Sequence, residues 1–142
     1  AVYNNGLPEI TRPLVANLWT KHKVVRADVE LNNGGNYYAS DLMTMLEDRG
    51  AKTSVRMFYT GENKRVKIIT YSDYVKSNFV FKHPSKSDSK EYKEFIKALG
   101  RWTQSGKNKN DDAPDAIAML AQLHQMLNGG SVKFLDRRKV GI

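Results

Sequence analysis

The spacing of apolar and polar residues along the chain predicts helices that alternate with strands. Residues 24–31 (VVRADVEL) are rich in β-branched side chains and predict a strand, and residues 53–59 predict another. Apolar residues that recur every three or four positions predict helices over residues 12–22, 37–48, 63–76 and 91–104. A last helix is expected to start at Asp111 or Asp112 and to reach about Leu127. This alternation is typical of an α/β domain with a mixed or parallel sheet.

Local signals predict details of two of these helices. Thr11, with Pro13 two residues later, is a favourable N-cap, so the first helix is expected to begin there. In the third helix Val66, Ile69 and Val75 recur on one side, and we expect them to face the core.

The chain is expected to form one domain. It shows no internal repeat and no linker, and its 142 residues are enough to bury a core. Residues 32–35 (NNGG), 84–90 (PSKSDSK) and 105–110 (SGKNKN) predict loops. We therefore expect a single domain over residues 1–130, followed by a basic tail over residues 131–142.

Composition narrows the class of partner. The chain carries 23 Lys and Arg against 15 Asp and Glu, a formal net charge of +8. A domain this basic favours polyanions, and nucleic acid is the commonest of them, but charge alone identifies no reaction. No apolar run approaches the roughly 18 residues that a membrane span needs, and no signal peptide is visible. Without cysteine, a disulfide framework and a thiolate site are excluded.

Glu30 stands near the carboxyl end of the first expected strand, directly before a glycine-rich loop. Ligands and catalytic groups gather at the carboxyl ends of strands in open α/β sheets. Asp28 lies two residues earlier and so shares a face with Glu30. An acidic pair on a central strand is costly to bury without a cation or hydrogen-bond donors. The alternative is that this face is exposed to solvent or lies at a sheet edge.

Three aspartates, Asp111, Asp112 and Asp115, open the last expected helix. Acids in the first turn complement the helix dipole and cap free N–H groups, which is the ordinary structural explanation. Three within five residues exceed what capping requires, and their spacing places them on one helix face. Like charges so close are unfavourable unless a cation lies among them, and Mg²⁺ and Mn²⁺ prefer such oxygen ligands.

Lys107 and Lys109 immediately precede the aspartates. They are placed to hold a DNA phosphate, although solvated loop lysines are the usual alternative. An acid at a strand end, acids that open a later helix and a basic background together suggest metal-assisted phosphodiester hydrolysis. In that chemistry two ions about 4 Å apart activate water and stabilise the leaving oxygen. No P-loop, zinc-ligand spacing or nucleophile elbow competes with this interpretation.

Two motifs resemble the nuclease domain of phage terminase large subunits. Residues 29–35 (VELNNGG) resemble the family's Glu-Ser-Asn-Asn-Gly-Gly segment. Residues 106–116 (GKNKNDDAPDA) resemble its Gly-Lys-Asn-Lys-His-Asp-Asp-Ala-Pro-Asp-Ala segment. The dipeptide Asn63-Lys64 and Trp102 fall in similar order, so the likeness covers most of the chain.

The resemblance implies a ribonuclease H-like mixed sheet flanked by helices, and cleavage of concatemeric double-stranded DNA with two divalent ions, Mg²⁺ or Mn²⁺. It implies that Glu30 is the strand carboxylate of the site. Asp112 is the first choice for the carboxylate on the other side, with Asp111 and Asp115 as further metal ligands. An N-terminal ATPase motor, a portal and a small terminase subunit are the implied partners, in the cytoplasm of a bacterial host.

The chain departs from the family at two places. Asn110 stands where histidine is frequent, and an amide cannot shuttle protons near neutral pH. Nothing before Glu9 matches the family's first metal-binding aspartate. We therefore expect the first strand or strands of the fold to be missing, residues 1–3 to be the tail of an early strand, and the fragment alone to be weakly active or inactive.

Two other functions are compatible with the same residues. One is a ribonuclease H-like domain that binds DNA or acts as a scaffold and has lost catalysis. The other is a different ribonuclease H-like nuclease, such as a junction resolvase or an integrase. Titration with magnesium or manganese separates the first of these from an active nuclease.

Overall fold

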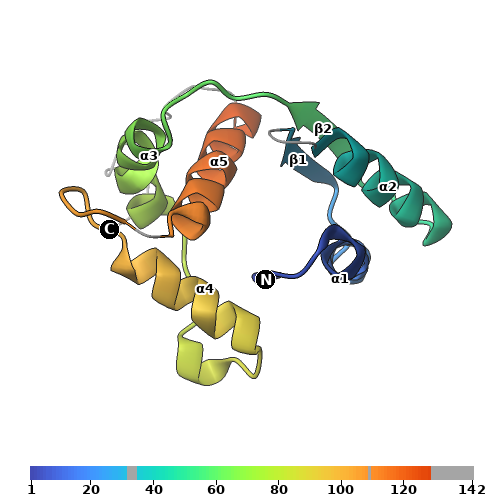
Figure 1. The fold of residues 1–142 in the computed structure, drawn as a ribbon, viewed down its shortest axis with the longest axis horizontal. Helices are drawn as coiled ribbons and strands as arrows, with labels where there is room; N and C mark the ends of the chain where they lie inside the picture. The colour runs from blue at the N-terminus through green and yellow to red at the C-terminus, as the bar shows by residue number, and fades with distance from the viewer. Residues whose placement is uncertain (32–34, 109, 129–142) are drawn as a thin grey trace, which may run out of the picture.

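A computed structural model describes residues 1–31, 35–108 and 110–128. In these ranges the fold is mixed α/β, with five α-helices, one short 3₁₀ helix and two strands (Figure 1). The elements in chain order are α1 (Pro8–Lys21), β1 (Arg26–Glu30), α2 (Gly35–Asp48), β2 (Ser54–Phe58), α3 (Lys64–Asn78), η2 (Pro84–Lys86), α4 (Lys90–Arg101) and α5 (Asp112–Leu127).

The two strands form a parallel sheet, as the alternation of strands and helices predicts. In their register Asp28 lies opposite Arg56, and Glu30 lies opposite Phe58. Parallel neighbours need a crossover connection, and α2 supplies it. The helix packs on α1 through a small core in which Ala16, Leu42 and Leu46 are buried. This half of the molecule positions the carboxyl end of β1.

The other half consists of α3, α4 and α5, which lie together on the opposite side from the sheet (Figure 1). Helix α5 packs along α3 and also contacts α4. Its most buried side chains are small, among them Ala113, Ala118 and Ala121, which lets the helices approach closely. A cavity of about 590 Å³ separates α5 from β1 and β2. Its walls include Ala27, Leu123 and other apolar side chains.

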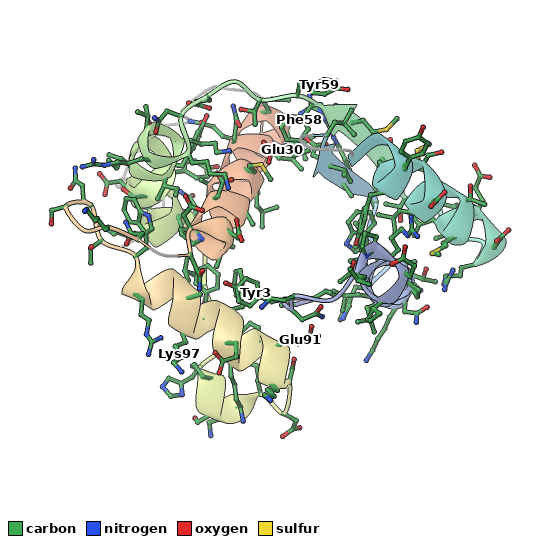
Figure 2. All side chains as sticks on the ribbon, in the orientation of Figure 1. Tyr3, Glu30, Phe58, Tyr59, Glu91 and Lys97 are labelled. Carbon is green, nitrogen blue, oxygen red and sulfur yellow. The ribbon has the colours of Figure 1, made fainter. Side chains whose placement is uncertain are left out.

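The N-terminal segment joins the two halves. The backbone N–H of Tyr3 donates a hydrogen bond to Glu91 of α4 at 3.2 Å, and the amide of Asn4 donates to the same carboxylate. The ring of Tyr3 also meets Phe95 edge to face, with 5.8 Å between centroids. Figure 2 shows Tyr3 and Glu91 near each other, where the segment reaches α4.

Several local expectations are corrected. Helix α1 begins at Pro8, because Leu7 accepts the first helical hydrogen bonds and Pro8 suits the first turn as well as Pro13 does. Residues 1–3, expected to be the tail of an early strand, belong to no strand of the described structure. Val66 is 55% exposed, whereas Lys67 and Ile68 are the buried residues of α3. The expected tail over residues 131–142 lies outside the described residues.

No helix in the described part of the chain is both long and apolar enough to cross a bilayer.

Candidate functional site

The start of α5 presents its acidic residues in an arrangement that capping does not explain. Asp111 occupies the N-cap position, yet its side chain makes no capping hydrogen bond. Its carbonyl accepts the first helical bond, from the N–H of Asp115 at 2.9 Å. Asp112 is exposed in the first turn, and Asp115 is buried one turn later. The carboxylate of Asp111 is therefore free of the helix end and available to a cation.

Lys64, the first residue of α3, supplies that cation. Its Nζ lies 3.5 Å from Asp111, 3.4 Å from Asp112 and 3.8 Å from Asp115, measured to carboxyl oxygens. Burial lowers the pKa of Lys64, but the combined attraction of the three aspartates outweighs burial and leaves this pKa raised. The lysine is therefore charged at neutral pH. Three carboxylates surround one ammonium group.

A second lysine on the same face of α3 binds the deepest aspartate. Lys67 Nζ lies 2.7 Å from Asp115 Oδ1, and the side chains are 1% and 6% exposed. Neither atom has a hydrogen bond of ordinary geometry, so the contact is a buried ion pair held by charge. This pair fixes α3 against the first turn of α5, and Asp115 is committed to a structural partner. Its expected role as a metal ligand stays a prediction.

Glu30 is the last residue of β1 and is half-buried. Figure 2 places it with Phe58 and Tyr59 at the carboxyl ends of the two strands. Its position at the strand end agrees with the sequence analysis. The expected convergence of Glu30 with Asp112 stays a prediction. Among the residues that the structure describes, no group of three or more acidic or histidine side chains is arranged to hold a metal ion.

Asp28 is neutralised by arginines from both strands. Arg56 Nη2 lies 2.5 Å from Asp28 Oδ2, and Arg26 Nε lies 3.5 Å from Asp28 Oδ1. The hydrogen bond to Asp28 raises the pKa of Arg56. Asp28 and Arg56 meet because they stand directly opposite each other on the paired strands. Asp28 is therefore part of a cross-strand ion pair.

The side chains at the start of α5 are of the chemical type that binds a divalent cation, although the described residues are not arranged around an ion. Carboxylates are the ligands that Mg²⁺ and Mn²⁺ prefer, and the Lys64 ammonium already shows that one positive centre is accommodated among Asp111, Asp112 and Asp115. Asp112 is the most accessible of the three, with a side chain 77% exposed. It opens onto a polar cavity of about 700 Å³, which the N-terminal segment and Asn110 also line.

Basic residues line a second, adjoining cavity of about 290 Å³. Lys107 from the loop after α4 lines it together with Lys97 and Arg101 of α4. Asn110 and Tyr3 line both cavities, so the cationic surface leads towards Asp112. Figure 2 labels Lys97 on α4. Lys109, the other lysine expected to hold a phosphate, lies outside the described residues.

The loop that carries Lys107 is held by Asn108. Its side chain accepts a hydrogen bond from the N–H of Thr103 at 3.0 Å and donates to the Thr103 carbonyl at 2.8 Å. A third bond, at 3.3 Å, goes to the carbonyl of Gly106. A Cβ on Gly106 would lie 2.2 Å from the Thr103 hydroxyl, so a glycine suits the turn.

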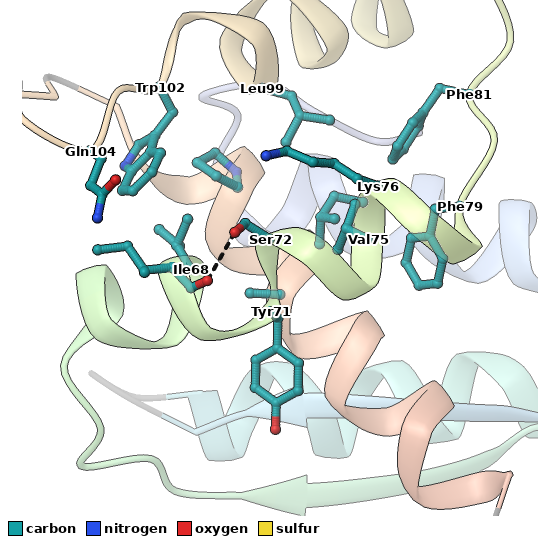
Figure 3. A pocket seen from close by; sticks show the side chains of 14 residues that line it. Ile68, Tyr71, Ser72, Val75, Lys76, Phe79, Phe81, Leu99, Trp102 and Gln104 are labelled. Carbon is teal, nitrogen blue, oxygen red and sulfur yellow. Dashed lines mark hydrogen bonds between the residues drawn. The ribbon is translucent and has the colours of Figure 1, made fainter. Parts of the chain in front are cut away.

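A separate apolar pocket of about 480 Å³ lies between α3, α4 and α5 (Figure 3). Val75, Leu99 and Trp102 line it, and the hydroxyl of Ser72 is turned back to the carbonyl of Ile69 at 2.9 Å. Lys76 is the one charged side chain among its described lining residues. The pocket therefore offers a mainly apolar surface, with no carboxylate among its described lining residues.

Neither Lys67 nor Lys64 was predicted to contact the aspartates at the start of α5. A signal for Lys67 was present, because this lysine precedes Ile68 in a helix whose apolar residues must face the core. A lysine on such a face requires an acidic partner. Three aspartates without an assigned counter-charge lay at the start of another helix. These observations indicate that a buried lysine needs an acid nearby, but they do not indicate which helix supplies it.

No family model, curated protein or solved structure matches this chain.

Proposed function

We propose that this chain is part of a metal-dependent endonuclease domain that hydrolyses the phosphodiester backbone of double-stranded DNA, of the kind found in DNA-packaging terminases. One observation carries the proposal. The Asp111 carboxylate makes no capping hydrogen bond, and the carboxylates of Asp111 and Asp112 lie 3.5 and 3.4 Å from Lys64 Nζ. That arrangement has the oxygen chemistry of a divalent-cation site, in a chain with a formal net charge of +8.

Each acidic residue has a distinct role in this proposal. Asp112 and Asp111 hold the cation from the α5 side, and Glu30 holds it from the end of β1. Asp115 positions the start of α5 through its ion pair with Lys67 and adds negative charge to the proposed cation site. A bound Mg²⁺ or Mn²⁺ supplies Lewis-acid activation of the phosphodiester and of water. Asn110 can donate a hydrogen bond to a phosphate oxygen, but its amide transfers no proton.

The DNA backbone is proposed to follow the cationic surface that leads to Asp112. Lys107, Lys97 and Arg101 line that surface, and phosphate contacts from such side chains are independent of base sequence. Arg101 and Lys97 thereby join the two lysines that the sequence analysis selected. This path predicts cleavage without strong sequence preference.

The sheet is proposed to be completed by further strands beside β1. In the described structure β1 pairs with β2 along one edge only. An open edge presents unpaired N–H and C=O groups that accept another strand. A ribonuclease H-like sheet would place an additional acidic residue next to Glu30, and it would cover the apolar walls between the sheet and α5. The ATPase motor, portal and small subunit implied by the resemblance belong to the same proposal.

One observation favours a second candidate, a domain that binds DNA without cutting it. The formal net charge of +8 attracts a polyanion whether or not a divalent ion is present. Phosphate contacts need no carboxylates, so DNA affinity alone does not separate the two functions.

A paired measurement of Mn²⁺ and DNA binding separates them. We expect the chain to bind Mn²⁺ at neutral pH, as measured by the paramagnetic resonance signal of the free ion. Asp112→Asn and Glu30→Gln should each weaken that binding by about tenfold or more, since each removes a charged ligand. Affinity for a DNA duplex, measured by fluorescence anisotropy without metal, should stay within about twofold of wild type.

Asp73→Asn is the matched control, because Asp73 is 95% exposed and pairs only with Lys76 in the described structure. It should leave Mn²⁺ affinity unchanged. DNA binding without any Mn²⁺ binding would overturn the nuclease proposal in favour of the DNA-binding module.

A further inference from the structure

Two cavities adjoin each other where the N-terminal segment reaches α4. The cavity of about 290 Å³ and the cavity of about 700 Å³ share Tyr3, Glu94 and Asn110 among their lining residues. Their remaining walls differ in charge and in side-chain chemistry. The two cavities therefore form one groove with a cationic end and a polar end.

The smaller cavity is the cationic end of the groove. Lys97, Arg101 and Lys107 line it, against one acid, Glu94. The carboxylate of Glu94 lies 3.9 Å from Lys97 Nζ, but both side chains are about half exposed, so this pair is weak. Three cationic side chains against one carboxylate favour the binding of a phosphate group.

The larger cavity is the polar end, and no cationic side chain stands among its described lining residues. Its lining residues include Asn5 and Asn110, which carry amide groups, and Tyr38, which carries a hydroxyl. Such groups both donate and accept hydrogen bonds, as the edge of a nucleobase does. Glu94 and Asp112 are the charged residues of this end, so it offers a phosphate no attraction.

Tyr3 stands where the two ends meet, and its ring is held in place before any ligand binds. Its backbone N–H donates a hydrogen bond to Glu91 at 3.2 Å, and its ring meets Phe95 edge to face at 5.8 Å between centroids. Tyr3 is partly exposed. A fixed and accessible aromatic ring beside cationic side chains is the combination on which single-stranded nucleic acids stack their bases.

We infer that the groove holds one unpaired nucleotide of a DNA strand, with its phosphate at the cationic end and its base stacked on Tyr3 in the polar end. The inference rests on the proposed function for the identity of the nucleic acid, and it adds the form of the substrate. A base reaches a side chain in this way only after it leaves the duplex stack. A fully paired duplex contacts the cationic end alone. Stacking accepts every base, which agrees with cleavage without strong sequence preference.

A comparison of single-stranded and double-stranded DNA tests this form of the substrate. The full chain is titrated into a fluorescein-labelled single strand of about 12 nucleotides, and into the duplex of the same length, and binding is followed by fluorescence anisotropy without metal. Charge alone would favour the duplex, because its charge density is higher. We expect the single strand to bind about threefold or more tightly, because only its bases can stack on Tyr3.

Substitution of Tyr3 separates stacking from charge. Tyr3→Leu removes the ring, and its affinity for the single strand should fall by about fivefold or more, whereas its affinity for the duplex should stay within about twofold of wild type. Tyr3→Phe keeps the ring and should bind both forms as wild type does. Tyr37→Leu is the control for loss of an aromatic side chain, because Tyr37 is 81% exposed and lines neither cavity.

A crosslink identifies the stacked residue without a variant. A single strand that carries 5-iododeoxyuridine in place of thymidine joins covalently to a stacked aromatic ring on irradiation. Peptide mass spectrometry of the wild-type chain should locate the crosslink at Tyr3 and not at Tyr37.

The outcomes separate the inference from the proposed function. Loss of single-strand affinity in Tyr3→Leu but not in Tyr3→Phe, with a crosslink at Tyr3, supports the nucleotide groove. If wild type binds the single strand no more tightly than the duplex, or if Tyr3→Leu loses affinity for neither form or for both equally, the inference is wrong. The proposed function then stands on Mn²⁺ binding and duplex affinity. If wild type binds neither form of DNA, both proposals are overturned.

Discussion

The ion pair between Lys67 and Asp115 sets the geometry on which the candidate site depends. Both side chains are almost fully buried, at 1% and 6% exposure. Removing one partner of such a pair leaves an uncompensated charge in the interior. Asp111 and Asp112 lie at the same end of α5 as Asp115. Loss of the ion pair between Lys67 and Asp115 is therefore expected to displace their carboxylates as well.

Lys67→Met is expected to lower the free energy of unfolding by about 3 kcal/mol, because the buried Asp115 loses its close partner and keeps only Lys64 at 3.8 Å. The double variant Lys67→Met/Asp115→Leu should recover most of that loss, since two apolar side chains can pack in the same space. Urea denaturation measures both. Lys76→Met, at an exposed pair, should cost less than about 1 kcal/mol. A double variant no more stable than the single one would contradict the structural role of this pair.

At the residue scale the sequence predicted the acids better than their partners. Glu30 and the aspartates at the start of α5 follow from strand-end and helix-start positions, which are local properties. Their counter-charges depend on which helix packs beside them, and that is a tertiary property. Val66 was expected to be buried because it recurs with other apolar residues on one side of the helix. In the structure Lys67 faces α5 and pairs with Asp115, and Val66 is 55% exposed.

At the scale of elements, the loop between α4 and α5 links the cationic surface to the acidic one. Asn108 makes three hydrogen bonds to the backbone of this loop, at 3.0, 2.8 and 3.3 Å. It thereby fixes the position from which Lys107 projects. A loop that is ordered before binding loses less conformational entropy when it meets a phosphate.

Asn108→Ala should therefore weaken binding to a DNA duplex by about three- to tenfold, through loss of order in the loop. Its melting temperature should fall only slightly, because the side chain is at the surface. Asn78→Ala is the control, since Asn78 also bonds a backbone carbonyl, at 2.9 Å, but far along α3. Fluorescence anisotropy compares the three proteins. Unchanged affinity in Asn108→Ala would remove this loop from the proposed DNA path.

Element types were predictable from hydrophobic spacing, and their ends were less so. The strand over residues 24–31 shortens to β1, and the last helix begins at Asp112, one of its two expected starts. The start of α1 was misplaced because two prolines fit a first turn equally well. The parallel pairing of β1 and β2 followed from the helix between them. Which helices contact which was not predictable from periodicity alone.

At the scale of the whole molecule, the sheet with α1 and α2 and the group of α3, α4 and α5 each carry half of the candidate site. Glu30 belongs to the first group, and Asp111 and Asp112 belong to the second. The N-terminal segment bridges them through Tyr3 and Glu91. The central claim of this account is that the two groups place their carboxylates around one divalent ion.

Anomalous scattering from a crystal grown with Mn²⁺ tests that claim most directly. We expect an anomalous peak between the carboxylates of Glu30 and Asp112. Crystals that bind Mn²⁺ elsewhere, or that show Glu30 and Asp112 on separate surfaces with no ion between them, would contradict it.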